Sequence, residues 1–384
     1  MIKLFLLCTV RFILSFFKIF RLQAKQCFFM SYAGTQYSCN PRAIYEYLDK
    51  KKEGFVFVWA VNDNINVKSV SENNSLILVT PNTLKYYFYL ITSKYVFTNI
   101  QLSTFIPKKK NSVWVNTWHG GGAFKKVEYP SINVYAKITK KLQCKQTDIY
   151  ISSSRIFTDV MSASSEIPKS KFLEIGMPRN DVFFADFNIR SEISKKVRTF
   201  YNLKKDDFIV LYAPTYRGSA SHGDFDMELD IAMIKSAFEN RFSRNVVFFI
   251  RAHHAVKNHN NLKDNVCIDV TSYPDMQDLE VAADALITDY SSCIYDFALT
   301  RKPGFLFTPD IEKYRIERGF YTDVSEWPYN FAESNQKFLE MIDEFDKSTF
   351  LLKNKEYLRK INSFDKGTAT KKLLDYININ GEKH

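Results

Sequence analysis

Three short runs of apolar residues in the second half of the chain constrain the fold most strongly. They cover residues 208–213, 246–250 and 285–288, and each is followed directly by polar or cationic residues. Apolar runs of this length without polar alternation are typical of strands buried on both faces, as in a parallel sheet. Because parallel strands need crossover connections, this half is predicted to be a doubly wound α/β domain that binds its ligand beyond the carboxyl ends of its strands.

The first half of the chain shows the same alternation of strands and helices. Strands are predicted over 27–31, 55–61, 94–99, 112–117 and 172–175, and helices over 41–51 and 81–92. With 384 residues, of which 46% are hydrophobic, the chain is long enough for two domains with separate cores. We interpret the polar run 190–207 as their connection, so the domains are predicted to cover 25–190 and 191–384.

Residues 1–24 form a separate apolar segment. It contains no uncharged stretch near the roughly 18 residues that a membrane span requires, because cations interrupt it. On a helical wheel these cations occupy one narrow arc; they are Lys3, Arg11, Lys18 and Arg21. The pattern favours an amphipathic helix lying on an anionic membrane surface over a signal peptide or a buried helix, since Arg11 follows the apolar run 4–10 too closely and no small-residue cleavage site follows.

Charge and cysteine content narrow the functional classes. The net charge of +11 fits an anionic partner, which could be nucleic acid, a membrane surface or a phosphorylated substrate. Nucleic acid is disfavoured because the chain has neither an aromatic RNA-binding pattern nor a basic recognition helix. The six cysteines are scattered without a Cys-x-x-Cys pair, so neither a zinc site nor a disulfide framework is indicated, and a reducing cytosol is the simpler interpretation.

A histidine and a run of glycines follow the predicted strand 112–117. His119 stands at the strand's carboxyl end, directly before Gly120, Gly121 and Gly122, and two lysines come shortly after. Glycines at such a place allow backbone N–H groups to approach a ligand closely. The residues alone leave a structural histidine and a phosphate-facing histidine equally open.

Residues 284–299 are predicted to form a strand, a tight turn and a helix. Ser291 and Ser292 would then stand at the start of the helix, where free N–H groups favour an anion, although Ser291 could be only a helix cap. The side chains expected at the ends of the three apolar strands suit a nucleotide diphosphate; they are Thr215, Arg217, Arg251, His253, Asp289, Ser291 and Ser292. The sequence has no P-loop and no Gly-x-Gly-x-x-Gly motif.

Five motifs in order give the chain a family resemblance. They are Trp-His-Gly at 118–120, Gly-Met-Pro-Arg-Asn-Asp at 176–181, Tyr-Ala-Pro-Thr-Tyr-Arg at 212–217, Arg-Ala-His at 251–253 and Ile-Thr-Asp-Tyr-Ser-Ser at 287–292. The segments 318–321 and 40–45 fit the same pattern. Over about residues 25–375 the chain resembles the CDP-glycerol glycerophosphotransferase family of teichoic acid and capsule polymerases.

This resemblance implies a GT-B-like α/β fold, with two Rossmann-like domains facing across a cleft. The domain 25–190 would bind the acceptor and the domain 191–384 the CDP-activated donor. The implied reaction transfers glycerol phosphate or a related polyol phosphate from CDP-glycerol or CDP-ribitol to a hydroxyl of a lipid-linked or polymeric glycan, with release of CMP. Such an enzyme is expected to be a peripheral protein on the cytoplasmic face of the cell membrane.

The resemblance also implies roles for individual residues. His119 and His253 correspond to the essential pair of the family; we expect His119 to be the general base, and the reverse assignment stays open. The residues expected to bind the donor or its phosphates are Gly120, Gly121, Arg179, Pro214, Thr215, Arg217, Arg251, Asp289, Ser291, Ser292 and Asp296. No protein-bound metal or cofactor is expected, and magnesium held mainly by the substrate phosphates is left open.

Two positions depart from the family pattern. Gly121 to Phe124 replace the usual Thr-Pro-Leu-Lys after Trp-His-Gly, and His254 stands where proline is common. These departures concern the identity of the donor or the acceptor, so the sequence does not decide between glycerol and ribitol, or between a primer enzyme and a polymerase. The main alternative is a GT-B glycosyltransferase that uses a nucleotide sugar.

Overall fold

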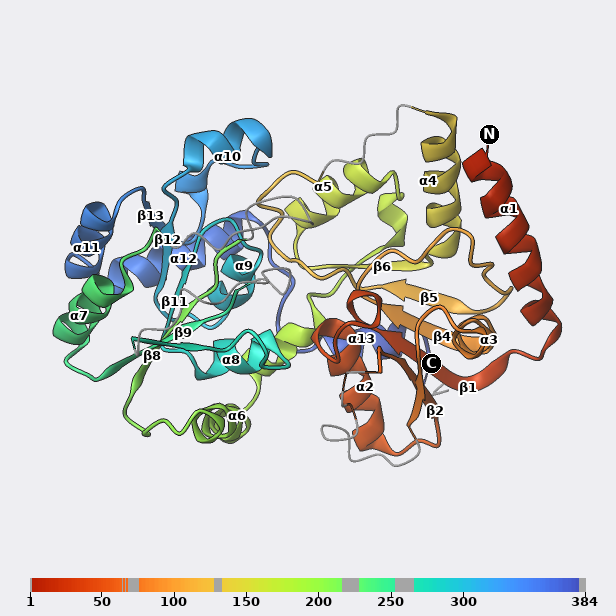
Figure 1. Cartoon of the computed structure of the whole chain (residues 1–384), viewed down its shortest axis with the longest axis horizontal. Helices are drawn as coiled ribbons and strands as arrows, with labels where there is room; N and C mark the ends of the chain where they lie inside the picture. Colours follow the sequence, from red (N-terminus) through yellow and green to blue (C-terminus); the bar gives the residue numbers. More distant parts are fainter. Residues whose placement is uncertain are drawn as a thin grey trace. The chain divides into compact units, whose positions relative to one another are not determined.

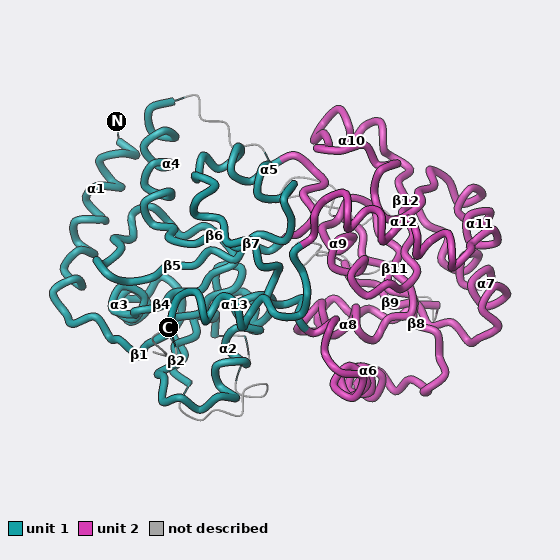
Figure 2. Tube along the Cα trace, turned by 180° about the vertical axis from the view of Figure 1, so that it is seen from behind, with its two compact units in different colours: residues 1–119, 127–181, 364–384 teal, residues 120–126, 182–363 magenta. Residues whose placement is uncertain are grey.

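The computed structural model describes residues 2–63, 65, 67, 76–127, 133–215, 228–252 and 266–379. The chain divides into two compact units (Figure 2). Unit 1 contains residues 1–119, 127–181 and 364–384, and unit 2 contains residues 120–126 and 182–363. Each unit is built on a parallel β-sheet, so the predicted α/β class with two sheets is confirmed.

Unit 1 has a seven-stranded sheet in the order β3-β2-β1-β4-β5-β6-β7, and all the adjacent strands run parallel (Figure 1). The strands are β1 (Gln23–Met30), β2 (Val56–Ala60), β3 (Ile77–Val79), β4 (Ser93–Thr98), β5 (Val113–Asn116), β6 (Ile149–Ser152) and β7 (Phe172–Glu174). The helices are α1 (Ile2–Leu14), α2 (Cys39–Lys51), α3 (Leu84–Thr92), α4 (Val134–Gln146), α5 (Arg155–Ser165) and α13 (Ala369–Tyr376), with short 3-10 helices at Ser15–Ile19, Tyr32–Gly34 and Lys169–Lys171.

Unit 2 has a six-stranded parallel sheet in the order β10-β9-β8-β11-β12-β13. The strands are β8 (Phe208–Tyr212), β9 (Val246–Ile250), β10 (Cys267–Asp269), β11 (Ala285–Thr288), β12 (Gly304–Phe307) and β13 (Asn330–Ala332). The helices are α6 (Phe187–Phe200), α7 (Ile231–Phe242), α8 (Met276–Ala282), α9 (Cys293–Ala298), α10 (Ile311–Glu317), α11 (Asn335–Asp343) and α12 (Lys347–Lys360), with 3-10 helices at Pro178–Phe184 and Val324–Glu326.

The three apolar runs that predicted the fold are the strands β8, β9 and β11 at the centre of the second sheet. Phe208, Val210, Phe248, Ile250 and Ile287 are buried and belong to one hydrophobic cluster. Burial of a side chain of this size contributes about 1.5–3 kcal/mol of hydrophobic free energy. The central strands therefore supply much of the core of unit 2, as the continuous apolar pattern indicates.

The boundaries between the units differ from the predicted 25–190 and 191–384. Residue 190 lies inside α6, which replaces the predicted connection, because one face of this polar segment packs on α8 and buries Val197. The chain's last segment returns to unit 1, where Asp181 accepts hydrogen bonds from the amides of Ala369 and Thr370, both at 2.8 Å, at the start of α13. This return depends on contacts between distant residues, so local patterns do not reveal it.

The N-terminal helix α1 directs a cation toward the protein. The guanidinium of Arg11 donates to the carbonyl oxygens of Thr104 and Ile106, and Leu7 and Leu14 are buried. Most of the exposed side chains of α1 and the 3-10 helix after it are apolar, but Lys3, Thr9 and Lys18 are exposed as well. The large apolar ones are Ile2, Phe5, Leu6, Phe12, Ile13, Phe16 and Ile19. Both views show α1 beside α4 (Figures 1 and 2). In the described ranges, no helix is both long and apolar enough to cross a membrane.

Candidate functional site

The loops after β8 and β11 are joined by a buried carboxylate. The backbone amide of Thr215 donates to both oxygens of Asp289, at 2.8 and 3.0 Å, and Asp289 is 3% exposed. The hydroxyl of Thr288 donates to the carbonyl of Ala213 at 2.7 Å. The carboxylate of Asp289 would repel an anionic diphosphate, whereas backbone amides can satisfy this carboxylate as hydrogen-bond donors. The geometry therefore indicates that Asp289 holds the loop of Pro214 and Thr215 in place.

The serines predicted at a helix start stand where the sequence placed them. Helix α9 begins at Cys293, and Ser292 occupies its N-cap position without a side-chain cap hydrogen bond. The hydroxyl of Ser291 meets the amide of Cys293 only at 3.5 Å, which is the outer limit for a hydrogen bond. Capping is thus a weak explanation for these two half-buried serines. Asp296, one turn further along α9, is 4% exposed.

Arg251 follows β9 and is held by two hydrogen bonds. Its backbone amide donates to the carbonyl of Tyr212, and its Nη1 donates to the carbonyl of Tyr273, each at 2.9 Å. The carboxyl ends of β8, β9 and β11 thus bring Pro214, Thr215, Arg251, Asp289, Ser291 and Ser292 to one edge of the sheet. The predicted site residues Arg217 and His253 lie outside the described residues.

The glycines after His119 pack against an aromatic ring. A Cβ atom at Gly121 would stand 2.3 Å from Cδ1 of Tyr295, and Gly122 has a φ of +81°. The chain that follows these glycines pairs with the motif at 318–321, since the backbone amide of Lys126 donates to the carbonyl of Gly319 at 3.0 Å. Close packing on α9 therefore gives these positions a structural reason for glycine, beside the close approach to a ligand that the sequence predicts.

His119 is oriented by a backbone carbonyl. It follows β5 in unit 1, and its Nδ1 lies 2.9 Å from the carbonyl oxygen of Asn99. Since a carbonyl oxygen can only accept, Nδ1 carries the proton and Nε2 of the neutral ring keeps a lone pair. The rings of Trp118 and Tyr32 lie with centroids 4.5 and 5.5 Å from that of His119. The imidazole is thus fixed in a form that can accept a proton at Nε2.

Two residues that the sequence did not connect with His119 support its turn. The amide Nδ2 of Asn40 donates to the carbonyls of Thr117 and Trp118, at 3.3 and 3.0 Å. The backbone amide of Arg179 in turn donates to Oδ1 of Asn40 at 3.0 Å. Arg179 was predicted to bind the donor; the structure buries it in unit 1 near this turn. The sequence signal that could have pointed to these two residues is their place in the family motifs, Asn40 in the motif at 40–45 and Arg179 in the motif at 176–181.

The partner of His119 is harder to find from sequence. Asn99 directly follows β4, next to β5 in the sheet, and its side-chain Oδ1 accepts from the amide of Tyr32 at 2.8 Å. The contact to His119 uses the backbone carbonyl of Asn99, which every residue type has. Only the neighbouring order of the two strands indicates it.

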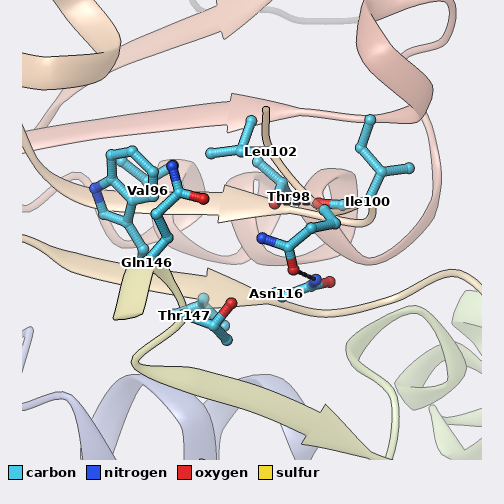
Figure 3. Close-up of a pocket in the computed structure, with 10 residues that line it drawn as sticks. Val96, Thr98, Ile100, Leu102, Asn116, Gln146 and Thr147 are labelled. Carbon is cyan, nitrogen blue, oxygen red and sulfur yellow. Dashed lines mark hydrogen bonds between the residues drawn. The ribbon is translucent and has the colours of Figure 1, made fainter. Parts of the chain in front are cut away.

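A pocket in unit 1 is too small for a substrate. It lies among residues of β4, the loop after β4, β5 and the end of α4, where Asn116 donates to Gln101 at 3.3 Å (Figure 3). Its volume of about 10 Å³ admits no more than one water molecule. In the part of the chain that the structure describes, no three His, Cys, Asp or Glu side chains are grouped so as to hold a metal ion.

Comparison with known proteins places the chain among enzymes of one kind. The model of the CDP-glycerol:poly(glycerophosphate) glycerophosphotransferase family matches residues 12–378. A teichoic acid poly(glycerol phosphate) polymerase of Bacillus spizizenii is 33% identical over 336 residues, which are 83% of each chain. A teichoic acid glycerol-phosphate transferase of Staphylococcus aureus is 27% identical over 84% of each chain.

Some relatives are longer than this chain, so the match covers only part of their length. A teichoic acid poly(glycerol phosphate) polymerase of Bacillus subtilis is 29% identical over 85% of this chain but only 45% of its own length, so this chain spans about half of that protein. A solved structure of a variant of the wall teichoic acid polymerase TagF is 25% identical, with a TM-score of 0.80 over 99% of this chain and 96% of that chain. The two-sheet fold described above is therefore shared with that enzyme.

Proposed function

Because the chain belongs to the CDP-glycerol:poly(glycerophosphate) glycerophosphotransferase family, we propose that it transfers a polyol phosphate from a CDP-activated donor to a hydroxyl. Glycerol phosphate is the favoured group, since the relatives named above are glycerol-phosphate enzymes of teichoic acid synthesis. The acceptor is a lipid-linked or polymeric glycan, as expected for synthesis of a teichoic acid or a related capsular polymer.

The observation that carries this proposal is the hydrogen bond between Nδ1 of His119 and the carbonyl of Asn99. It leaves Nε2 as the acceptor for the proton of the attacking hydroxyl. The hydroxyl oxygen forms a bond to the donor phosphorus that bears the polyol, and the bond from this phosphorus to the bridging oxygen breaks. CMP leaves with the electron pair, and the proton stays on Nε2 until solvent removes it. A general base in this position contributes on the order of 10²–10⁴-fold to the rate.

Unit 2 supplies the donor site in this proposal. The guanidinium of Arg251 and the hydroxyls of Ser291 and Ser292 would neutralise and hydrogen-bond the diphosphate, while Asp289 keeps the loop of Thr215 in position. Phosphoryl transfer depends mainly on such positioning and charge neutralisation. The proposal assigns no metal to the protein; magnesium held by the donor's own phosphates would add to the neutralisation.

The fold and the apolar helix α1 support two further parts of the proposal. The two sheets correspond to the Rossmann-like halves of a GT-B-like enzyme, with the donor bound by unit 2 and the acceptor by unit 1. The exposed apolar side chains of α1 would enter the interfacial region of the membrane, on its cytoplasmic face, which makes the enzyme peripheral. Arg11 is bound to backbone carbonyls, whereas the other predicted cations, Lys3, Lys18 and Arg21, are exposed, so these three would add an electrostatic attraction to the hydrophobic contact.

The nucleotide that is released tests the proposal. Purified protein is incubated with CDP-glycerol or with CDP-ribitol and a lipid-linked acceptor, and the nucleotides are separated by chromatography. We expect CMP in amounts equal to the polyol phosphate that is transferred. A nucleotide-sugar glycosyltransferase would instead release a nucleoside diphosphate from its own donor and leave both CDP-polyols intact, and that result would contradict the proposal.

A further inference from the structure

Unit 2 has a pocket of about 590 Å³ at the edge of its sheet opposite the proposed donor-binding residues. It is lined by α6 and by residues that come just before the strands β8, β9, β11 and β12, including Lys205, Arg244, Asp284 and Lys302. The pocket therefore lies at the amino-terminal edge of the sheet, whereas Thr215, Arg251 and Ser291 follow the strands. Its volume is within the range of ligand pockets, roughly 300–1,000 Å³. Both views show α6 beside α8, which lines the pocket with Val281 (Figures 1 and 2).

The charge of this pocket is strongly unbalanced. Among its described lining residues, six are cationic and one, Asp284, is acidic; the cationic residues are Arg190, Lys195, Arg198, Lys205, Arg244 and Lys302. Asp284 is shared by two arginines, with Arg198 at 3.3 Å and Arg244 at 3.7 Å. Both guanidinium groups also donate to the carbonyl of Asp207, at 3.0 and 3.1 Å. These bonds hold two cations rigidly at the pocket wall.

Lys302 adds a half-buried cation. Its Nζ donates to the carbonyls of Val281 and Ala283, each at 2.6 Å, at the end of α8. Burial is the main reason why the pKa of Lys302 is lowered to about 8; Asp284 and Glu280 oppose this effect, and Arg190 and Arg198 add to it.

Three other cations are available to a ligand. Within the described ranges, the side chains of Arg190, Lys195 and Lys205 make no hydrogen bond or ion pair, and all three are exposed. Arg190 and Arg198 are eight residues apart on α6, which separates them by about 12 Å along the helix axis. One phosphate group cannot contact both ends of this row, so the pocket matches a ligand with several phosphates.

We propose that this pocket binds a linear chain of phosphodiester groups, the polyol-phosphate polymer itself, at the edge of the sheet opposite the donor site. The inference rests on the proposed function, because only an enzyme that builds or extends such a chain meets it as acceptor or product. The phosphates contact the row of cations, and the carbon atoms of the backbone contact Phe183, Phe187 and Leu203. Charge-assisted hydrogen bonds from arginine to phosphate favour this pairing.

The test compares two triple variants of the full chain. The pocket variant is Arg190→Ser, Lys195→Ser and Lys205→Ser, chosen because these side chains support no other described residue. The control variant is Lys313→Ser, Lys347→Ser and Lys355→Ser, which removes the same charge from exposed positions of unit 2 outside the pocket. Calorimetry measures the affinity of a synthetic glycerol-phosphate oligomer of defined length, with inorganic phosphate and CMP as comparison ligands.

We expect the pocket variant to bind the oligomer about tenfold more weakly than wild type, and the control variant to lose less than about twofold. Affinity for inorganic phosphate should be weak in all three proteins. Equal losses in both variants, or none in the pocket variant, would overturn the inference. A loss of CMP binding with unchanged oligomer binding would also overturn it, because the pocket would then be a nucleotide site.

Failure of the pocket and failure of the enzyme remain distinguishable. Binding of the oligomer is measured without turnover, and CMP release from CDP-glycerol with a short acceptor is measured on the same preparations. An intact pocket effect without CMP release would refute the proposed function and keep the pocket as a phosphodiester site. Normal CMP release with no pocket effect would refute the pocket alone.

Discussion

At the scale of single residues, the clearest chemical assignment is the orientation of His119. Its Nδ1 is bound to the carbonyl of Asn99, so Nε2 is the ring nitrogen proposed to accept the proton. We predict that His119→Ala lowers kcat by about 10²–10⁴-fold, because the attacking hydroxyl loses its base. Thermal unfolding should change little, since the ring is only partly buried. Steady-state kinetics with CDP-glycerol check this, and near-normal turnover of the variant would show that another group accepts the proton.

A second prediction at this scale tests whether packing against Tyr295 is the reason why position 121 needs glycine. We predict that Gly121→Ala destabilises the protein by about 1–3 kcal/mol, since the added Cβ would meet the ring of Tyr295 at 2.3 Å. Adding Tyr295→Ala removes that clash, so chemical denaturation should show the double variant to be more stable than the sum of the single effects predicts. Strict additivity would mean that Tyr295 is not what requires glycine.

At the scale of secondary structure elements, Lys302 couples the end of α8 to pH. Its pKa is about 8 in the folded protein against the usual 10.5, and the charged groups around it are Asp284, Glu280, Arg190 and Arg198. Between these pH values the unfolded chain binds the proton that the folded protein has released, so this group raises stability as pH increases. Relative to Lys302→Met, the free energy of unfolding of wild type should rise by up to about 3 kcal/mol from pH 8 to pH 10.5. Urea titrations at a series of pH values measure the difference, and a constant offset would contradict a lowered pKa.

The orientation of α1 predicts how the protein meets a membrane. Phe5 and Phe12 are 75% and 81% exposed, whereas Arg11 is turned inward. We predict that Phe5→Ser with Phe12→Ser releases the protein from vesicles in a flotation assay, and that high salt alone releases only part of the wild-type protein, through the exposed cations Lys3 and Lys18. The matched control is Leu84→Ser with Ile316→Ser, two residues that are 74% and 85% exposed on other elements. Complete release of the wild-type protein by salt, or equal release of the control variant, would show that the apolar face of α1 is not the anchor.

At the scale of the whole molecule, local sequence patterns predicted the helices and strands better than the contacts between distant segments. Continuous apolar runs identified β8, β9 and β11, and the position of His119 after β5 followed from its strand. The polar sequence of α6 was interpreted as a linker, because the helix buries only one face and its other side chains are largely polar. The return of α13 to unit 1 depends on Asp181, which is 188 residues from Ala369. Likewise, the contact of His119 with Asn99 uses a backbone carbonyl, which leaves no trace in residue type.

The transferred group tests the central claim most directly. Wild-type protein and His119→Ala are incubated with CDP-glycerol and a lipid-linked acceptor, and the acceptor is weighed by mass spectrometry. We predict that wild type adds whole glycerol-phosphate units to the acceptor, and that the variant adds almost none in the same time. An acceptor that gains a sugar from a nucleotide sugar but no glycerol phosphate from CDP-glycerol would contradict the account.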